Sequence, residues 1–392
     1  MHTLPKGFSL AVANADFREK NLPRKDLSLV LCEQKTVAAG CFTTNLFKAA
    51  PVLCSQKNLA ESEEIRAIVI NSGQANACTG EKGMQTCLKS QAIIEELFDL
   101  PKGSVLTGST GIIGAHINLE KWEEASYELK TNLGEATLED YAKSIMTTDA
   151  FPKISYKKIE KNGKEVIFAG VAKGAGMICP NMATMLSVLI SDVQVDKETW
   201  TETIKNAVRQ GFNTVSVDGD TSTNDSLFAL SSGLSRVSLE KEELQAIVTE
   251  IIQELAYLLV KDGEGASKVM HIDVTGAKTD ADAEKIARTV GHSQLVKTAV
   301  YGKDPNWGRI VAAAGRAGVP FNPEKLGLTL CGIEIFKDGQ PVDMDIDAVF
   351  RPLFDQKDID IQIHLAEGNG KASLKASDLT HDYVSLNADY RS

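Results

Sequence analysis

The sequence lacks the patterns of a membrane protein and of a nucleic-acid-binding protein. No apolar stretch approaches the roughly 20 residues that a membrane-spanning helix needs. Lys and Arg never form a run of five, and 42 of these residues stand against 53 Asp and Glu, a formal charge of −11. An acidic chain offers no electrostatic footprint for a polyanion. We therefore expect neither a membrane span nor a nucleic-acid partner.

Signals for secretion, disulfide bonds and zinc are missing as well. Residues 1–20 mix charges with short apolar stretches and lack the continuous apolar segment of a signal peptide. The cysteines are odd in number, none forms a C-x-x-C pair, and none stands at zinc-like spacing from a histidine. We expect reduced thiols that pack as small buried hydrophobes, no metal site, and a cytoplasmic protein. The seven cysteines are Cys32, Cys41, Cys54, Cys78, Cys87, Cys179 and Cys331.

Length and composition are those of a globular protein with more than one domain. At roughly 150 residues per domain, the 392 residues correspond to two or three domains. The apolar fraction of 43% and the charged fraction of 24% argue against disorder. Strand-like and helix-like segments alternate through the first two thirds, and strands dominate from residue 328 onward. The sequence predicts an α/β body over residues 1–275 and a smaller α+β domain over 276–392.

Apolar periodicity and capping residues place the main elements. Asp196 and Ser238 are predicted helix N-caps, and Asp338-Gly339 is a typical two-residue hairpin turn. The predicted helices cover 82–98, 196–211, 239–261, 279–290 and 307–317. The predicted strands cover 67–70, 165–173, 185–190, 328–336, 359–365 and 371–379.

The segment TGSTGIIG, residues 107–114, has a composition that ordinary surface loops lack. Its spaced glycines let the backbone approach a ligand closely and direct N–H groups at an anion. It has no Gly-Lys-Ser/Thr, which excludes a Walker A phosphate loop. Two interpretations remain, a tight strand–helix turn and an oxyanion hole that stabilises a tetrahedral intermediate.

The segment KGAGMICPNMATML, residues 173–186, contains a candidate nucleophile. Gly174 and Gly176 lack the third glycine of a dinucleotide fingerprint. Thr184 could be activated by its own α-amine if the chain were cut before it, and the small Ala183 would leave room for the hydroxyl to make that cut. An α-amine with a pKa near 7.7–8.0 is a suitable base at neutral pH. Composition alone favours the simpler alternative, a turn leading into a core strand.

The acidic segment 215–225 begins like an EF-hand calcium loop. However, Thr223 occupies the position that requires Gly, and Ala229 occupies the position that requires a bidentate Glu. These departures exclude a calcium loop and leave a hydrogen-bonded Asx or Ser/Thr turn as the simple alternative.

Glu264 stands between two glycines just after a predicted helix. It is either an ordinary exposed carboxylate or a group that faces a cationic substrate. The six histidines are scattered, and none has the spacing of a catalytic triad.

Taken together, these segments resemble the glutamate N-acetyltransferase family, also called ornithine acetyltransferase, of arginine biosynthesis. The signature is the block 173–186, whose Ala-Thr junction is the family's self-cleavage site. The other matching blocks are 71–80, 109–111, 218–225, 302–309 and 387–392. The blocks follow in the family's order along essentially the whole chain. The resemblance implies an α/β fold of stacked sheets and helices with a smaller C-terminal domain.

The resemblance also assigns roles to matching residues. It implies cleavage between Ala183 and Thr184, which gives an alpha chain of residues 1–183 and a beta chain of residues 184–392. Thr184 is the implied nucleophile, and Thr110 and Gly111 are the implied oxyanion donors. The implied substrate contacts are Thr147, Lys173, Thr184, Glu264, Asn387 and Ser392. The family usually ends in Thr, and Ser392 keeps the hydroxyl. Lys173 can pair with a substrate carboxylate and Glu264 with an ammonium group.

The implied reaction is acetyl transfer in two halves. Thr184 takes acetyl from N2-acetyl-L-ornithine and passes it to L-glutamate, which predicts ping-pong kinetics and no metal or organic cofactor. Some members of the family also use acetyl-CoA as a donor, so the resemblance leaves open two donor sets, acetylornithine alone or acetylornithine and acetyl-CoA. The family's mature form is a heterotetramer of two alpha and two beta chains. The alternatives are an aminopeptidase or amidase with the same N-terminal nucleophile, and a non-catalytic α/β binding protein.

Overall fold

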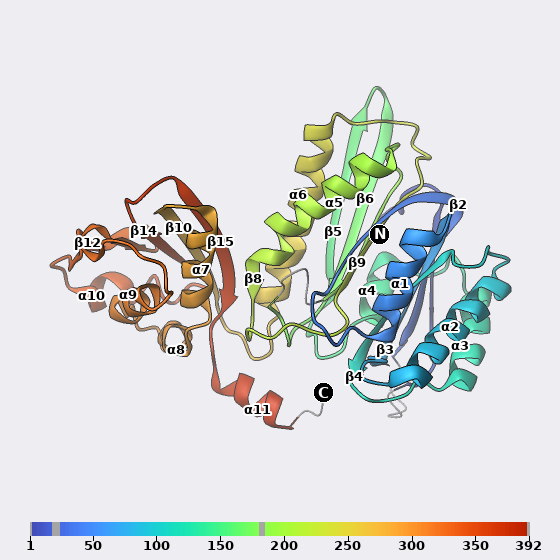
Figure 1. Cartoon of the computed structure of the whole chain (residues 1–392), viewed down its shortest axis with the longest axis horizontal. Coiled ribbons are helices and arrows are strands. Elements are labelled where there is room, and N and C mark those ends of the chain that lie inside the picture. Colours follow the sequence, from blue (N-terminus) through green and yellow to red (C-terminus); the bar gives the residue numbers. More distant parts are fainter. Residues whose placement is uncertain (1, 18–23, 180–184, 390–392) are drawn as a thin grey trace. The chain divides into compact units, whose positions relative to one another are not determined.

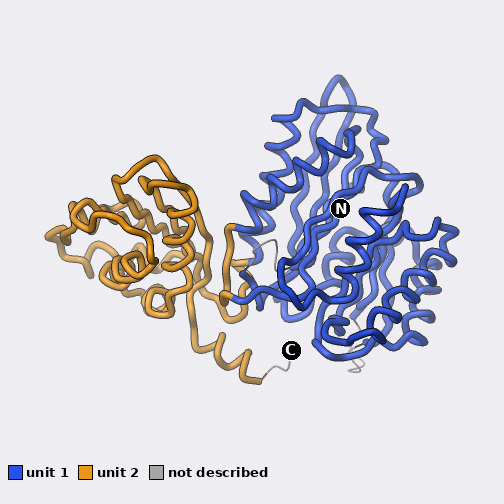
Figure 2. Tube along the Cα trace, viewed as in Figure 1, with its two compact units in different colours: residues 1–213, 220–259, 391–392 blue, residues 214–219, 260–390 orange. Residues whose placement is uncertain are grey.

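The computed structural model describes residues 2–17, 24–179 and 185–389 (Figure 1). The described chain forms two compact units (Figure 2). The first comprises residues 1–213 and 220–259, and the second comprises residues 214–219 and 260–390. Each unit contains one sheet flanked by helices, which confirms the predicted mixed α/β fold class.

The first unit is built on an eight-stranded sheet. The strand order is β4-β3-β2-β9-β7-β6-β5, and β1 pairs with β2. The long strand β2 pairs with β3 near its start and with β9 near its end, and so joins the two halves of the sheet. The strands are β1 (Phe8–Ala13), β2 (Leu27–Phe42), β3 (Ile65–Gln74), β4 (Val105–Ile112), β5 (Lys153–Lys161), β6 (Lys164–Lys173), β7 (Leu186–Ser191) and β9 (Ser226–Ser231).

Helices cover this sheet and bury both faces of β3. Ala67 and Val69 belong to the apolar cluster that contains Trp122 of α3, whereas Ile68 and Ile70 belong to the cluster that contains Tyr141 of α4. Strand residues alternate between the two faces, so a strand buried on both faces has the continuous apolar run seen here. The helices are α1 (Ala50–Glu61), α2 (Gly80–Leu97), α3 (Leu119–Thr131), α4 (Leu138–Ser144), α5 (Lys197–Gln210) and α6 (Lys241–Lys261), with the 3₁₀ turn η1 (Phe212–Thr214).

The second unit has a seven-stranded sheet in the order β13-β12-β11-β14-β10-β15-β8. Its core contains the alternating Ile359, Ile361 and Ile363 of β14 packed with Ile286 and Val290 of α7. The strands are β8 (Val215–Ser216), β10 (Val269–Ala277), β11 (Gly327–Leu330), β12 (Ile333–Lys337), β13 (Gln340–Pro341), β14 (Asp358–His364) and β15 (Gly370–Ser377). The helices are α7 (Asp280–Gly291), α8 (Gln294–Tyr301), α9 (Trp307–Gly315), α10 (Ile346–Phe350) and α11 (His381–Asp389), with the 3₁₀ turn η2 (Pro323–Lys325).

Two predictions about elements of the C-terminal half are wrong. The predicted strand 328–336 is two strands, β11 and β12, because Cys331 and Gly332 form a turn with φ values of 47° and 81°. Helix α6 begins at Lys241, so Ser238 does not cap it. The predicted hairpin at Asp338-Gly339 is confirmed, since Lys337 pairs with Gln340 and both turn residues have positive φ.

All seven cysteines are free thiols. Five are buried as predicted, but Cys78 is exposed and Cys331 is half-buried. No helix among the described residues is long and apolar enough to cross a membrane. The described residues also contain no group of three metal-ligating side chains.

Candidate active site

The site of the first unit begins where two parallel strands end side by side. Residues Ser72 and Gly73 of β3 pair with Thr110 and Gly111 of β4. The interpretation of 107–114 as a strand–helix turn is wrong, because residues 107–112 belong to β4. Gly111 has φ 130°, and a Cβ there would lie 2.2 Å from the carbonyl carbon of Gly73. Only glycine fits this close approach of two backbones.

Asn224 connects three of the segments that the sequence singles out. Its side-chain amide donates to the carbonyl of Ala75 (2.6 Å) and to the carbonyl of Ser109 (2.8 Å). The nearby Thr221 hydroxyl donates to the carbonyl of Cys179 (2.9 Å) in the fourth segment. Hydrogen bonds therefore bring segments from four distant parts of the chain to one end of the sheet.

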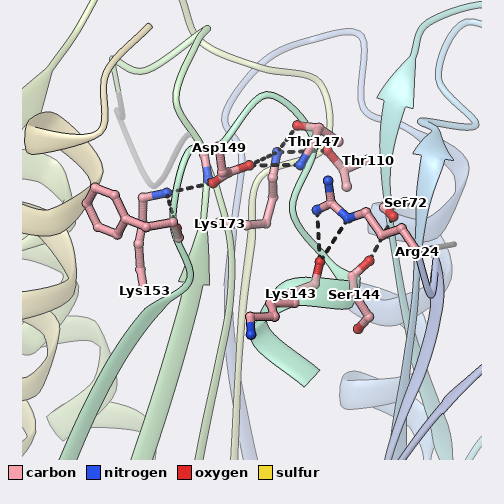
Figure 3. Close-up of polar contacts among 11 residues, drawn as sticks. Arg24, Ser72, Thr110, Lys143, Ser144, Thr147, Asp149, Lys153 and Lys173 are labelled. Atoms are coloured by element: carbon pink, nitrogen blue, oxygen red, sulfur yellow. Dashed lines mark hydrogen bonds and ion pairs between the residues drawn. The ribbon is translucent and has the colours of Figure 1, made fainter. Parts of the chain in front are cut away.

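Lys173 lies at the centre of this region (Figure 3). Its ammonium group donates to the hydroxyl of Thr147 (2.8 Å) and to the hydroxyl of Thr110 (3.1 Å). The residue is only 7% exposed. An ammonium group can only donate, so both hydroxyls accept in these bonds and retain their own hydrogens for another acceptor. The structure thus brings together three of the residues predicted from the sequence.

Asp149 supports this cluster from the other side (Figure 3), and sequence reasoning missed it. Its carboxylate accepts from the ammonium group of Lys153 (2.7 Å), from the N–H of Thr147 (2.8 Å) and from the N–H of Gly174 (2.6 Å). The ammonium group of Lys173 lies 3.9 Å from the same carboxylate. Burial alone would raise the pKa of Asp149, but the two ammonium groups and the hydrogen bonds hold that pKa well below its usual range.

Ala183 and Thr184 lie outside the described residues. The neighbouring described chain is nonetheless fixed, because Leu186 pairs with Lys173 across β6 and β7. The carbonyl of Met185, the residue that follows Thr184, accepts from the N–H of Ser226 (2.9 Å). The chain therefore enters β7 opposite Lys173.

The remaining predicted site residues belong to the second unit or lie outside the described residues. The carboxylate of Glu264 accepts from the side-chain amide of Asn387 (3.0 Å), which also donates to the carbonyl of Tyr383 (3.0 Å). Glu264 and Asn387 are therefore neighbours within that unit. Ser392 lies outside the described residues.

Comparison with known proteins identifies the class of protein that carries this site, an acyltransferase of arginine biosynthesis. The chain belongs to the ArgJ family, whose profile matches residues 9–392. The predicted family and enzyme class are therefore confirmed.

The relatives match nearly the whole of this chain. An arginine biosynthesis bifunctional protein ArgJ from Nitratidesulfovibrio vulgaris is 51% identical, with 100% of both chains covered. A protein of the same name from Thermotoga neapolitana is 41% identical, with 99% of each chain covered. The chloroplastic protein of that name from rice is 40% identical, with 99% of this chain and 86% of the rice protein covered.

Two solved structures are also similar. The ArgJ structure from Bacillus halodurans has a TM-score of 0.51 and 34% identity, and covers 53% of this chain and 100% of its own. The Mycobacterium tuberculosis ornithine acetyltransferase complexed with ornithine has a TM-score of 0.39 and 29% identity, and covers 46% of this chain and 94% of its own.

Proposed function

We propose that the chain cuts itself between Ala183 and Thr184 and then transfers acetyl from N2-acetyl-L-ornithine to L-glutamate through an ester on Thr184. The observation that carries this proposal is the contact of Lys173 with Thr110 and Thr147 at the point where the chain enters β7. This contact places two hydroxyls and a positive charge at the end of the sheet to which Thr184 is covalently tied.

The first step is the cut. The Thr184 hydroxyl attacks the carbonyl of Ala183, and the peptide C–N bond breaks as its nitrogen takes up a proton, which frees the α-amine of Thr184 and leaves an ester. Water then hydrolyses the ester and releases the Thr184 hydroxyl and the Ala183 carboxylate. Support comes from the solved Bacillus halodurans chain, whose whole length corresponds to 53% of this chain. A cut after residue 183 leaves a C-terminal piece of nearly that share.

The second step loads the enzyme. The α-amine of Thr184 takes the hydroxyl proton while the hydroxyl oxygen attacks the acetyl carbonyl of N2-acetyl-L-ornithine. The oxyanion that forms accepts hydrogen bonds from the Thr110 hydroxyl and the Gly111 N–H. The C–N bond then breaks, and ornithine leaves as its amine takes up the proton. Thr110 can donate because its bond with Lys173 uses only a lone pair.

The third step returns the acetyl group. The neutral amino group of L-glutamate attacks the Thr184 ester, and the same donors stabilise the second oxyanion. The bond between the acetyl carbon and the Thr184 oxygen then breaks, that oxygen takes up the proton lost by the glutamate nitrogen, and N-acetyl-L-glutamate leaves. The relatives are named bifunctional, and we propose that acetyl-CoA is a second acetyl donor that loads Thr184 in the same way. The acetyl group is carried by the chain itself, so acetyl-CoA is a substrate and no organic cofactor takes part.

The substrate contacts divide by charge. Lys173 and Thr147 suit a substrate carboxylate, and Glu264 with Asn387 suits a substrate ammonium group. Ser392 completes the set in this proposal. We also propose an α2β2 assembly in the cytoplasm, a reducing compartment that suits the seven free thiols.

The test is substitution of the nucleophile. Thr184→Ala should yield one full-length, inactive polypeptide, whereas wild-type protein should yield pieces 1–183 and 184–392, the second beginning Thr-Met-Leu-Ser by Edman degradation. Thr298→Ala, on the exposed face of α8, is the matched control and should be processed normally. Continued cutting at the same bond in Thr184→Ala would rule out the autocatalytic step.

The donor is tested separately. Incubation of purified protein with acetyl-CoA and glutamate, without acetylornithine, should form N-acetylglutamate. Simple deacetylation of acetylornithine without transfer would instead favour the aminopeptidase or amidase alternative.

A further inference from the structure

The buried ion pair of Asp149 and Lys153 lies next to the Lys173 ammonium group. We infer that these two are positioning residues, which hold the Lys173 ammonium group against the Thr110 hydroxyl so that its charge strengthens the oxyanion donor. This inference rests on the proposed function of Thr110 in the transfer.

The pair is costly as a purely structural device. The side chains of Asp149 and Lys153 are both 0% exposed, and their charged atoms lie 2.7 Å apart. Removing two charges from water has a large desolvation cost, and an apolar pair of similar volume is often equally stable or more stable. Stability alone therefore gives no reason for this pair, whereas its connections to the site do.

Both backbone hydrogen bonds that the Asp149 carboxylate accepts lead toward the site. One oxygen fixes the N–H of Thr147, whose hydroxyl accepts from Lys173. The other oxygen fixes the N–H of Gly174, the residue at which the segment toward the cleavage junction leaves β6. The Asp149 carboxylate thus fixes the position of Thr147 and of the backbone next to Lys173.

Lys153 supplies a positive charge next to the Asp149 carboxylate. Asp149 without Lys153 would have Lys173 as the nearest described ammonium group, and would draw that group toward itself. With Lys153 in place, the three side chains carry two positive charges and one negative charge. Lys153 is paired with the Asp149 carboxylate, and the bond from Lys173 to Thr110 directs the Lys173 charge at the proposed oxyanion donor. A cation on the acceptor side of a hydroxyl makes that hydroxyl a stronger donor.

The experiment compares charge removal with fold stability. Asp149→Asn combined with Lys153→Met removes one charge of each sign and leaves the net charge of the cluster unchanged, so the variant should fold and unfold at a temperature close to that of wild type. Its kcat for acetyl transfer should fall by about 10- to 100-fold, the size expected for a small misplacement of a reacting group. The KM for acetylornithine should change by much less than kcat. A crystal structure of the variant should show the bond from Lys173 to Thr110 broken or lengthened.

Asp192→Asn is the matched control. Asp192 is also 0% exposed and accepts backbone hydrogen bonds from Ile167 (2.9 Å) and Lys6 (3.1 Å) at the other end of β7. This variant should lose stability and keep the wild-type kcat.

Two outcomes would overturn the inference. One is a double variant with wild-type kcat, and the other is a loss confined to KM, which would assign the pair to substrate binding. If the double variant does not fold, Lys153→Met alone decides, since it too should lower kcat and an unchanged kcat would reject the idea. Wild-type protein that transfers no acetyl group would refute the proposed function itself, which is a different result.

Discussion

At the scale of single residues, Thr110 has the most sharply defined task. Its hydroxyl accepts from the buried Lys173 and keeps a hydrogen for the oxyanion. Thr110→Val keeps the shape and removes the donor, so kcat should fall by about 10²–10³-fold, equivalent to about 2.7–4 kcal/mol of transition-state stabilisation. Steady-state kinetics of the processed variant provide the measurement. Thr110→Ser retains the hydroxyl and should recover most of the rate, and a fully active Thr110→Val would remove Thr110 from the site.

Gly111 is constrained by space and Gly114 only by conformation. Both have positive φ, but a Cβ at Gly111 would strike the backbone of Gly73, while a Cβ at Gly114 would meet nothing within 4 Å. Gly114→Ala should therefore lower the free energy of unfolding by about 1–2 kcal/mol, the strain that a side chain adds in the left-handed region. Gly111→Ala should lower the free energy of unfolding further, because β3 and β4 must move apart. Urea unfolding of both variants measures the difference, and equal losses would contradict the clash.

The site residues that could be predicted from the sequence are those that belong to a recognisable motif. Thr110, Gly111, Thr147 and Lys173 come from the resemblance, and the structure places Lys173 against both threonines. Asp149 was missed because its importance lies in partners that only folding brings together. A buried Lys153 is likewise invisible in a sequence, where lysine is expected on the surface.

At the scale of elements, one of the two capping predictions is correct and the other is wrong, since Ser238 does not cap α6. Asp196 caps α5 by accepting from the N–H of Thr199, and the helix ends before Gly211, as predicted. The predicted strand 328–336 fails because its apolar run hides a tight turn at Cys331-Gly332. Cysteine in the left-handed region is uncommon, so the local signal of that turn is Gly332, an isolated glycine within a strand pattern.

The cap of α7 offers a test at this scale. The hydroxyl of Thr279 accepts from the N–H of Asp282 (3.1 Å), one of the donors that the first turn leaves without a helical partner. Thr279→Ala should reduce the free energy of unfolding by about 1 kcal/mol. Thr289→Ala, within the same helix, removes no cap and should be neutral or slightly stabilising, because alanine has the higher helix propensity. Thermal unfolding measures both, and equal effects would show that the cap contributes nothing.

At the scale of the whole molecule, the domain boundary at 275/276 and the cut at 183/184 stay predictions. A sequence pattern also does not show how a chain cut at 183/184 would hold together. The sheet order supplies that argument. In the first unit, β7 and β9 follow residue 184 in the sequence, and they lie between β6 and β2, which precede it. A cut in the segment between β6 and β7 would leave two strands of the beta chain enclosed by strands of the alpha chain.

Separation of the two pieces would therefore require two open sheet edges and an exposed core. Val188, Ile190, Phe228 and Leu230 of β7 and β9 are buried in one cluster with β3 and β6 residues such as Ile68. We expect the mature protein to elute as one species on gel filtration in native buffer and to show two bands on a denaturing gel. The pieces should part only at the urea concentration at which the circular dichroism signal is lost, because burial of apolar surface and the strand pairing are removed together. Dissociation in native buffer would mean that the cut lies elsewhere in the chain.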